Sequence, residues 1–359
     1  MIKIAISIGT LQTGGAEMFV INLLKNLNYQ KYQVLLLVLD KPHGGYLEYE
    51  AAQLPIKIRY LEKKRGFRPL VMIKIFRVLK KYQPNILHGN IGGTIYFLLY
   101  LLFTKKIKLI HTTHTSPQKE FSKMKRRILT VLYQRKRIIP VVINNDMLDE
   151  FIKTYHIQEQ VKLIPNGIDI KKFCFNRNYQ FENIMIGHVG RFEEVKNHRM
   201  IVKVYKRLIA DGYPVSLKLI GDGSLYQEVK TELQDYPVKY IKSSNHIEIE
   251  LQEIDIFFFP SLYEGLPLSI LEAMASGIVI IGSKTGGLKE LIEKGKNGYL
   301  IDCNNEEGFY NSFITLLNDT NKIMIMSKNN INKVKQYSIE KMVAGYEKLY
   351  LKEAKSVKW

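Results

Sequence analysis

The sequence predicts an α/β protein with two doubly wound parallel-sheet domains, and three observations support this fold class. Short runs of β-branched and apolar residues alternate with longer segments of helical periodicity, as expected for βα units around a parallel sheet. The alternation stops near residues 167–182 and then begins again. The length of 359 residues exceeds what one ordinary core supports and suits two domains.

The first half shows seven strand patterns separated by helical patterns. Strands are predicted over 2–8, 32–39, 56–61, 85–89, 108–114, 138–144 and 161–167. Helices are predicted over 16–27, 70–82, 93–103 and 146–155, with a basic helix within 105–137. The most apolar window, 95–103, is far shorter than the ~20 residues of a membrane span, so it predicts a buried helix.

The second half repeats this pattern. Strands are predicted over 183–190, 216–223, 238–242, 255–261 and 278–283, and helices over 197–212, 224–234 and 267–277. Residues 288–302 continue the alternation and 338–356 read as a last helix. We therefore expect a first domain over 1–170, a second over 171–340, and a C-terminal helix over 341–359 that is able to pack back on the first domain.

The net charge of +19 is concentrated in the first half. Residues 1–180 hold 30 Lys and Arg against 11 Asp and Glu, whereas residues 181–359 hold 23 of each. In 63–81 and 105–137 the cations alternate with large apolar residues, as in a helix on an anionic membrane surface. A solvated helix face is the alternative. The same charge would also suit binding to nucleic acid, but no helix-turn-helix, RNP-like aromatic pair or zinc finger accompanies it, so no nucleic-acid partner is expected.

The N-terminus and the cysteines favour a cytoplasmic protein. Residues 1–10 read as a first strand and lack the long apolar segment and cleavage site of a signal peptide. Cys174 and Cys303 are the only cysteines, which excludes a disulfide scaffold and a cysteine-rich zinc site.

A glycine pair follows the first predicted strand. Gly14 and Gly15 precede a helix that begins near Ala16, and glycines there let backbone N–H groups approach an anion at the helix N-terminus. A tight strand-to-helix turn also needs glycine, so both interpretations stand. The stretch is not G-x-G-x-x-G, and a nicotinamide cofactor is not indicated.

Two cations follow the first strand of the second half. Gly190 ends that strand, Arg191 comes next, and Lys196 lies at the start of the following helix. A guanidinium fork supplies geometry and a lysine supplies point charge, a combination suited to a diphosphate. The alternative is a pair of solvated cations.

Glu264 and Glu272 lie in the otherwise apolar stretch 260–287. Residues 265–267 read as a turn and 268–275 as a helix whose N-terminus offers N–H groups to a phosphate. Glu264 precedes this helix and Glu272 lies one turn into it, so both can reach one ligand, and carboxylates accept hydrogen bonds from sugar or ribose hydroxyls. A lysine partner for Glu272 is the alternative.

Together these motifs resemble the retaining nucleotide-sugar glycosyltransferases of family 4, which have the GT-B architecture of two facing Rossmann-like domains with a cleft between them. The resemblance spans nearly the whole chain and rests on TGGAE, IPNGID, GRFEEVKN, IGDG, the segment from Glu264 to Glu272, and TGG…E…NGYLI. Residues 264–277 are most similar to members that assemble capsular, exopolysaccharide or other lipid-linked surface glycans.

The resemblance implies roles for single residues. Glu264 would contact the transferred sugar near its anomeric carbon, and His114, with His111 as the alternative, matches the histidine that contacts the donor sugar. Arg191 and Lys196 would hold the diphosphate. The full set of donor-binding residues would be Gly15, Gly190, Arg191, Lys196, Gly265, Leu268, Ser269 and Glu272.

A mechanism is also implied. The leaving diphosphate, stabilised by cations and a helix N-terminus, can take the acceptor proton while the acceptor attacks on the same face through an oxocarbenium-like state. No metal and no other cofactor are expected, because the cations do the work of a divalent ion. A double displacement would need a carboxylate nucleophile; Glu264 is the candidate, and this route is disfavoured.

The sequence therefore predicts a glycosyltransferase that moves a sugar from a nucleotide-sugar donor to a glycan or lipid-linked acceptor, bound peripherally to the inner face of the cell membrane. Residues 240–252 lack the glycine usual in the nucleobase loop, so uridine over guanosine is a preference only. A non-catalytic glycan-binding subunit of the same fold, or a sugar-nucleotide epimerase, is the alternative.

Overall fold

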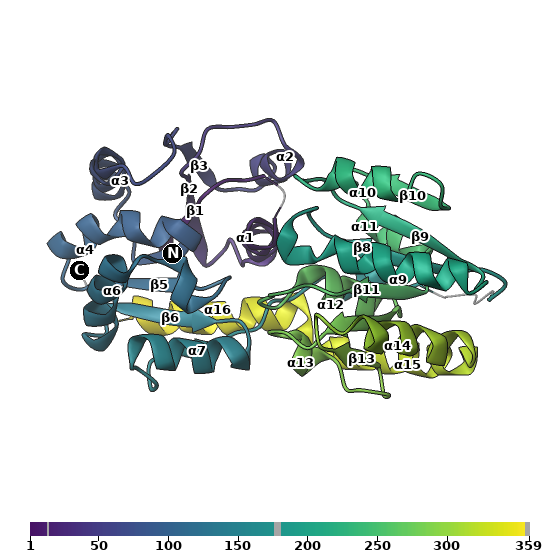
Figure 1. Ribbon diagram of the computed structural model, residues 1–359. Coiled ribbons are helices and arrows are strands. Elements are labelled where there is room, and N and C mark those ends of the chain that lie inside the picture. The colour runs from purple at the N-terminus through teal and green to yellow at the C-terminus, as the bar shows by residue number, and fades with distance from the viewer. Residues whose placement is uncertain (13, 176–180, 356–359) are drawn as a thin grey trace. The chain divides into compact units, whose positions relative to one another are not determined.

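The computed structural model describes residues 1–12, 14–175 and 181–355 (Figure 1). The chain divides into two compact units: unit 1 comprises 1–167 and 339–359, and unit 2 comprises 168–338. The division thus falls close to the boundary expected at 170, and the C-terminal helix lies in unit 1. Residues 176–180 of the expected boundary segment and 356–359 of the last segment lie outside the described residues.

Within the described residues, unit 1 is built on a seven-stranded sheet in the order β3-β2-β1-β4-β5-β6-β7. Every pairing in it is parallel. Its strands are β1 (Ile2–Ile8), β2 (Tyr32–Val38), β3 (Lys57–Tyr60), β4 (Ile86–Asn90), β5 (Lys108–Thr112), β6 (Ile138–Val142) and β7 (Lys162–Leu163).

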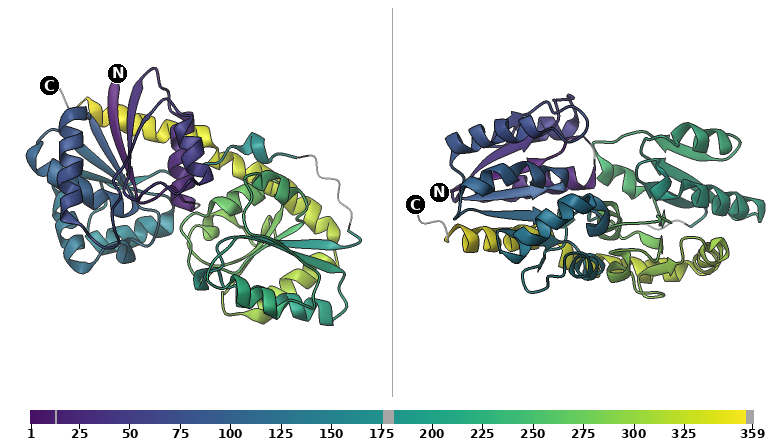
Figure 2. Two further views of the ribbon diagram at one scale, coloured as in Figure 1. Left: turned by 90° about the horizontal axis from the view of Figure 1, so that it is seen from above. Right: turned by 60° about the vertical axis from the view of Figure 1, so that its left-hand side comes forward.

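Helices cover both faces of this sheet (Figures 1 and 2). Right-handed crossovers place α3, α4 and α6 on one face and α1 and α2 on the other, where α16 joins them in one hydrophobic core. The helices of unit 1 are α1 (Gly15–Asn26), α2 (Tyr46–Ala52), α3 (Pro69–Tyr82), the 3-10 helix η1 (Ile91–Phe97), α4 (Leu98–Phe103), α5 (Pro117–Glu120), α6 (Lys123–Gln134), α7 (Asn145–Tyr155) and α16 (Ile339–Ala354).

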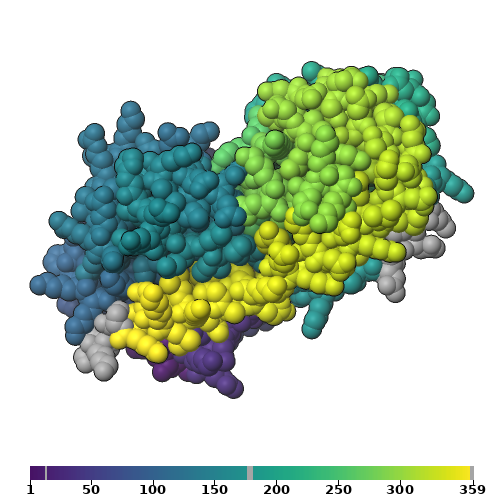
Figure 3. All heavy atoms as spheres, turned by 90° about the horizontal axis from the view of Figure 1, so that it is seen from below, coloured from purple at the N-terminus to yellow at the C-terminus, as the bar shows by residue number. Residues whose placement is uncertain are grey.

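The C-terminal helix α16 runs along the surface of unit 1 (Figure 3) and is tied to the sheet by a buried polar network. His88 Nδ1 lies 2.7 Å from the Tyr350 hydroxyl, and His88 Nε2 lies 2.8 Å from Thr112 Oγ1, which is 2.9 Å from the Tyr346 hydroxyl. Burial lowers the pKa of His88 to about 3, so the ring is neutral. Each polar group finds a partner, which makes the burial tolerable.

The apolar segment 93–103 differs from its prediction. It begins as a 3-10 helix and continues as α4. Phe97 and Leu101 are buried, but Leu102 and Phe103 are 74% and 71% exposed. A helix against a sheet buries one face only, so the prediction of a buried helix was wrong for its last two residues.

Unit 2 repeats the winding. In its described part a six-stranded parallel sheet has the order β10-β9-β8-β11-β12-β13. The strands are β8 (Ile184–Val189), β9 (Val215–Ile220), β10 (Val238–Ile241), β11 (Ile256–Phe259), β12 (Val279–Ser283) and β13 (Gly298–Ile301). The helices are α8 (Ile170–Phe173), η2 (Glu194–Lys196), α9 (His198–Ala210), α10 (Tyr226–Glu232), α11 (Ile247–Gln252), α12 (Leu268–Ala275), α13 (Leu288–Leu291), α14 (Glu306–Leu317), α15 (Thr320–Val334) and η3 (Lys335–Tyr337).

These two sheets confirm the predicted fold class of two Rossmann-like parallel-sheet units. In each unit the carboxyl ends of the strands share one edge, where ligands of open α/β sheets bind. Among the described residues, no helix combines the length and the apolar character needed to cross a bilayer.

Candidate functional site

The predicted donor residues of unit 2 follow strands β8 and β11. Gly190 comes directly after β8, and its N–H donates to the carbonyl of Ile220 at the end of β9 (3.0 Å). A Cβ on Gly190 would lie 2.9 Å from His188 Nε2 and 3.4 Å from the Lys196 side chain. Gly190 therefore leaves room for Lys196 to cross the end of the strand.

Lys196 and Glu264 form the centre of this site. Lys196 Nζ lies 2.6 Å from Glu264 Oε1, and the side chains are only 15% and 11% exposed. The ammonium also lies 4.7 Å from the centre of the Phe259 ring. Two largely buried charges lose much hydration and compensate each other, so removing either one would leave the other uncompensated.

Two glycines of the turn after β12 hold the loop that carries Glu264. Gly287 N–H donates to the Gly265 carbonyl (2.7 Å). Gly286 has φ +46°, and a Cβ there would lie 1.8 Å from the Glu264 carbonyl oxygen. Because a side chain at Gly286 is excluded by both conformation and contact, this glycine turn fixes the backbone of Glu264 and Gly265.

Arg191 is exposed beside Gly190, and its backbone is fixed by the residue that follows it. Phe192 is fully buried, its N–H donates to Asp222 (3.0 Å), and its carbonyl accepts from the N–H of Leu225 (2.9 Å). A Cβ on Gly223 would lie 2.8 Å from the Phe192 nitrogen. The loop after β9 thus holds the backbone next to Arg191, which is exposed at the end of β8.

The helix α12 begins at Leu268, as predicted, directly after this loop. Pro267 precedes it and provides no side-chain hydrogen bond to the helix start. The first N–H groups of the helix, including those of Leu268 and Ser269, have no carbonyl partner within it. Unit 2 therefore brings together two cations, a helix N-terminus and Glu264 at neighbouring strand ends.

Glu272 lies one turn into α12, near Lys172 and Glu248; the sequence analysis allowed a lysine partner for Glu272 but identified neither residue. Burial raises the pKa of Glu272 to about 7, while Lys172 acts to lower it and Glu248 to raise it. Lys172 Nζ and Glu248 Oε2 form an ion pair of 3.1 Å. Lys172 follows the IPNGID motif by only a few residues, but that motif alone does not show that α8 packs beside α12.

The two candidate histidines of unit 1 have different surroundings. His111, inside β5, is buried, with Nδ1 2.6 Å from the Tyr133 hydroxyl and Nε2 3.0 Å from Glu120. His114 lies beyond the strand end and is partly buried, with Nε2 3.0 Å from Asn90 Oδ1. Burial lowers the pKa of His114 to about 3, so it is neutral. Of the two, His114 is placed where the carboxyl ends of the strands meet.

The glycine pair after β1 is faced by a carboxylate of the chain. Gly15 begins α1, and Gly14 precedes it. A Cβ on Gly14 would lie 2.3 Å from Glu17 Oε2, so the glycine makes room for Glu17 in the first turn of the helix. An acidic side chain there complements the positive end of the helix. Gly14 therefore has a structural role in addition to any contact with a ligand, whereas a Cβ on Gly15 would meet no non-neighbouring atom of the described residues within 4 Å.

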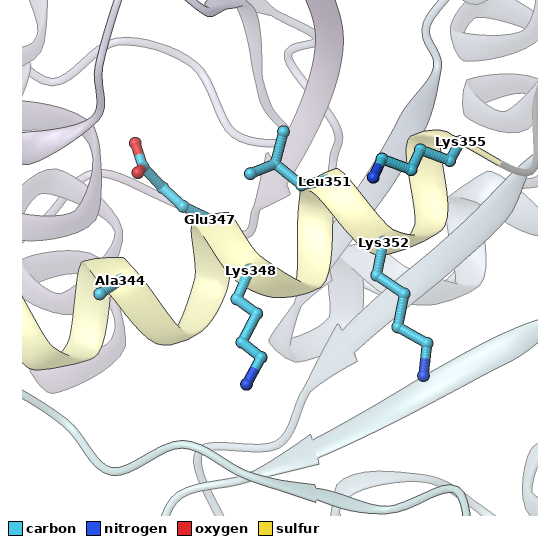
Figure 4. Close-up of a pocket in the computed structure, with 6 residues that line it drawn as sticks. All are labelled: Ala344, Glu347, Lys348, Leu351, Lys352 and Lys355. Atoms are coloured by element: carbon cyan, nitrogen blue, oxygen red, sulfur yellow. The ribbon is translucent and has the colours of Figure 1, made fainter.

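A shallow groove of about 530 Å³ runs along α16 (Figure 4). Figure 4 shows Lys348 and Lys352 extending from one side of the helix and Glu347 and Leu351 from the other. These side chains do not converge on a point, and the groove contains none of the predicted site residues.

Two family models match the chain in succession. Residues 13–172 match the model described as Glycosyltransferase Family 4, and residues 169–333 match the model described as Glycosyl transferases group 1. Together the matches extend over residues 13–333, which include most of each unit but neither β1 nor α16.

Curated relatives have related names. Over 294 residues, 76% of each protein, the chain is 28% identical to the putative glycosyltransferase EpsF of Bacillus subtilis. It is 28% identical over 307 residues, 78% of each protein, to the UDP-Gal:alpha-D-GlcNAc-diphosphoundecaprenol alpha-1,3-galactosyltransferase of Escherichia coli.

Solved structures share the fold. Anabaena Alr3699/HepE in complex with UDP superposes with a TM-score of 0.81 at 19% identity, over 98% of this chain and all of that one. A glycosyltransferase from Rickettsia africae gives a TM-score of 0.82 at 17% identity, over 99% of both chains.

The raised pKa of Glu272 predicts a pH-dependent effect on stability. The unfolded carboxyl ionises near its ordinary pKa of about 4.5, whereas the folded one stays protonated up to about pH 7. The free energy of unfolding therefore falls as the pH rises from 4.5 to 7, and the loss is constant above that range. We expect Glu272→Gln to stabilise the protein at pH 8 by on the order of 2 kcal/mol, and not at pH 4.5.

Denaturant unfolding of both proteins between pH 4.5 and 8.5 measures this difference. Glu232→Gln, on the exposed side of α10, is the matched control and should show no such pH dependence. A difference between wild type and Glu272→Gln that stays constant with pH would contradict the raised pKa.

Proposed function

Because this chain belongs to the group 1 glycosyltransferases of family 4, we propose that it transfers a sugar from a nucleotide-sugar donor, UDP-linked by preference, to a lipid-linked or glycan acceptor during assembly of a surface glycan. The observation that carries this proposal is the site at the strand ends of unit 2. There Arg191, Lys196 and the N-terminus of α12 provide positive charge and N–H donors beside the carboxylate of Glu264.

The donor diphosphate would bind to these positive groups. In the structure, Lys196 is paired with Glu264 at 2.6 Å. A diphosphate carries more negative charge than a carboxylate, so its arrival would draw the ammonium away from Glu264. The freed carboxylate could then accept hydrogen bonds from the sugar. Glu264 thus compensates Lys196 in the free protein and contacts the sugar in the complex.

Names of relatives support the choice of donor and acceptor. The Escherichia coli relative is named for UDP-Gal and for a GlcNAc-diphosphoundecaprenol acceptor. A Campylobacter jejuni relative, 23% identical over 341 residues, is named for an acceptor linked to diphospho-undecaprenol. We infer the same classes, a UDP-sugar and a lipid-linked glycan, for this chain.

The same residues support transfer with retention and without a metal. Arg191, Lys196 and the helix N-terminus would stabilise charge that develops on the leaving diphosphate, which would take the acceptor proton. Glu272 would accept hydrogen bonds from the ribose hydroxyls. His114, neutral and partly buried at the strand ends of unit 1, is the proposed catalytic histidine.

Replacing Arg191 tests the proposed diphosphate site. We expect Arg191→Ala to lower kcat/KM by at least on the order of a hundredfold, because a charge donor to the transition state is lost. Sugar transfer from a panel of UDP-sugars to prenyl-diphosphate sugars measures this loss. Arg199→Ala, on the exposed side of α9, is the control and should stay active. Full activity of Arg191→Ala, or loss of wild-type activity on addition of EDTA, would contradict the assignment.

The charge of unit 1 supports peripheral binding to an anionic membrane. Residues 63–137 hold nineteen Lys and Arg and one acidic residue, so this stretch accounts for +18 of the net charge of +19. The acidic residue, Glu120, is 3% exposed and bonded to His111. Residues 63–137, which include α3, α4 and α6, therefore contribute no exposed carboxylate to the face of the sheet that these helices cover.

Exposed apolar side chains lie among these cations. Met124, Ile128 and Val131 lie on one side of α6 at helical spacing and are 71%, 48% and 44% exposed. A hydrogen bond joins α6 to α4. The guanidinium of Arg137, just after α6, donates to the carbonyl of Leu101 in α4 (2.8 Å). Basic and exposed apolar residues on one helical layer are typical of a surface that binds anionic lipid. We infer binding to the inner face of the cell membrane.

Charge reversal on α6 tests this membrane surface. We expect wild type to bind vesicles of phosphatidylglycerol and phosphatidylcholine and high salt to release it. Lys123→Glu, Arg127→Glu and Arg135→Glu together should weaken binding by about a hundredfold, at about 1 kcal/mol per cation lost. The triple variant Lys203→Glu, Lys230→Glu and Lys294→Glu changes the charge equally in unit 2 and should bind normally. Equal cosedimentation of all three proteins would contradict the proposal.

A further inference from the structure

The main chain next to Lys196 is bonded to the loop that carries its partner, Glu264. The carbonyl of Val195 accepts from the N–H of Leu262 (2.8 Å), and Leu262 lies two residues before Glu264. The N–H of Lys196 itself donates to the carbonyl of Glu193 (2.9 Å). On this side of Lys196, the backbone is therefore fixed relative to the loop after β11.

Asn197, on the other side of Lys196, connects two further strand ends through its side chain. Its Nδ2 donates to the carbonyl of Pro260 (3.1 Å) and to that of Cys303 (3.2 Å). Pro260 directly follows β11, and Cys303 lies two residues after the end of β13. A side-chain amide nitrogen has two N–H donors, and Asn197 uses both. One side chain thus ties the segment after β8 to the ends of two other strands.

The backbone of Asn197 has the left-handed conformation, with φ +54° and ψ +47°. Glycine and asparagine adopt this conformation more readily than most residues. Asn197 is also the N-cap residue of α9, but its side chain does not accept from the first N–H groups of that helix. Helix capping, the usual reason for asparagine at such a position, therefore does not explain this residue. A glycine would suit the conformation equally well and would lack the two hydrogen bonds.

The surroundings of the Lys196 side chain leave it little room. A Cβ on Gly190 would lie 3.4 Å from Lys196 Cδ and Cε and 2.9 Å from Nε2 of the buried His188. The ammonium lies 4.7 Å from the centre of the Phe259 ring. The side chain therefore crosses the end of β8 in a narrow passage, and a shift of the main chain at residue 196 would move the ammonium with it.

We propose that Asn197 is a positioning residue that holds Lys196 at the donor site. Its two hydrogen bonds, together with the one at Val195, fix the main chain on both sides of the lysine. The exchange of Glu264 for a diphosphate then requires movement of the Lys196 side chain alone, so the site is preorganised for the donor. This proposal rests on the proposed function, because it takes Lys196 as a ligand of the donor diphosphate.

A double-mutant cycle on UDP binding tests whether Asn197 acts through Lys196. Calorimetry measures the Kd of UDP for wild type, Asn197→Gly, Lys196→Met and the double variant. Glycine keeps the left-handed backbone and loses the amide, so we expect Asn197→Gly to raise the Kd about tenfold. In the Lys196→Met background the same change should raise the Kd less than about twofold, because the group that Asn197 positions is gone.

Asn183→Gly is the matched control. Asn183 precedes β8 at the opposite end of the sheet, where its Nδ2 donates to Ser216 Oγ (2.8 Å), and the variant should bind UDP as wild type does. Asn197→Asp is a second test variant. It keeps the size and left-handed preference of the side chain but cannot donate to the two carbonyls, so it should weaken UDP binding at least as much as Asn197→Gly. Thermal unfolding without ligand checks that each variant is folded.

The outcomes separate this proposal from the proposed function. Equal Kd values for wild type, Asn197→Gly and Asn197→Asp would overturn the positioning role. An equal loss of affinity with and without Lys196 would also overturn it, because Asn197 would then support the fold rather than the lysine. If UDP does not bind to wild type, the nucleotide site of unit 2 fails, and this inference fails with it.

Discussion

The parallel pairing of every strand is the constraint on which the rest of the structure depends. A parallel strand must return through a crossover, so all strands of a sheet end at the same edge. In unit 2 this places the residues after β8, β11 and β12 together, although Lys196, Glu264 and Gly286 are far apart in the sequence. In unit 1 it gathers the turn of Asp40, the end of β4 at Asn90, and His114.

At that edge of unit 2, glycines and one ion pair determine what the site can do. Gly190 and Gly286 allow backbone and side chains to approach so closely that Lys196 reaches Glu264. The pair is neutral overall and largely buried. It therefore keeps the Lys196 ammonium at the place where the donor diphosphate is expected to bind. A site of this kind favours a ligand that brings its own negative charge, because binding replaces one anionic partner of Lys196 by another.

The fold and most of unit 2's site could be predicted from the sequence. Strand and helix periods, the glycine turns and the start of α12 at Leu268 are local properties, and local residues determine them. The roles of Lys172 and Glu248 could not be predicted, because they depend on how α8 and α11 pack beside α12. Which of His111 and His114 lies beyond the strand end depended on the actual end of β5. The exposure of Leu102 and Phe103 depended on which face of α4 meets the sheet.

Calorimetric titration of UDP into wild type, Lys196→Met and Glu264→Gln tests the central claim that Lys196 exchanges Glu264 for the donor diphosphate. The account predicts that Lys196→Met binds UDP about tenfold or more weakly, as expected for a lost charged hydrogen bond. Glu264→Gln should bind UDP at least as tightly as wild type, because Lys196 no longer has to leave a carboxylate. Equal weakening of UDP binding by both variants would contradict the exchange and would make the ion pair a structural support of the site.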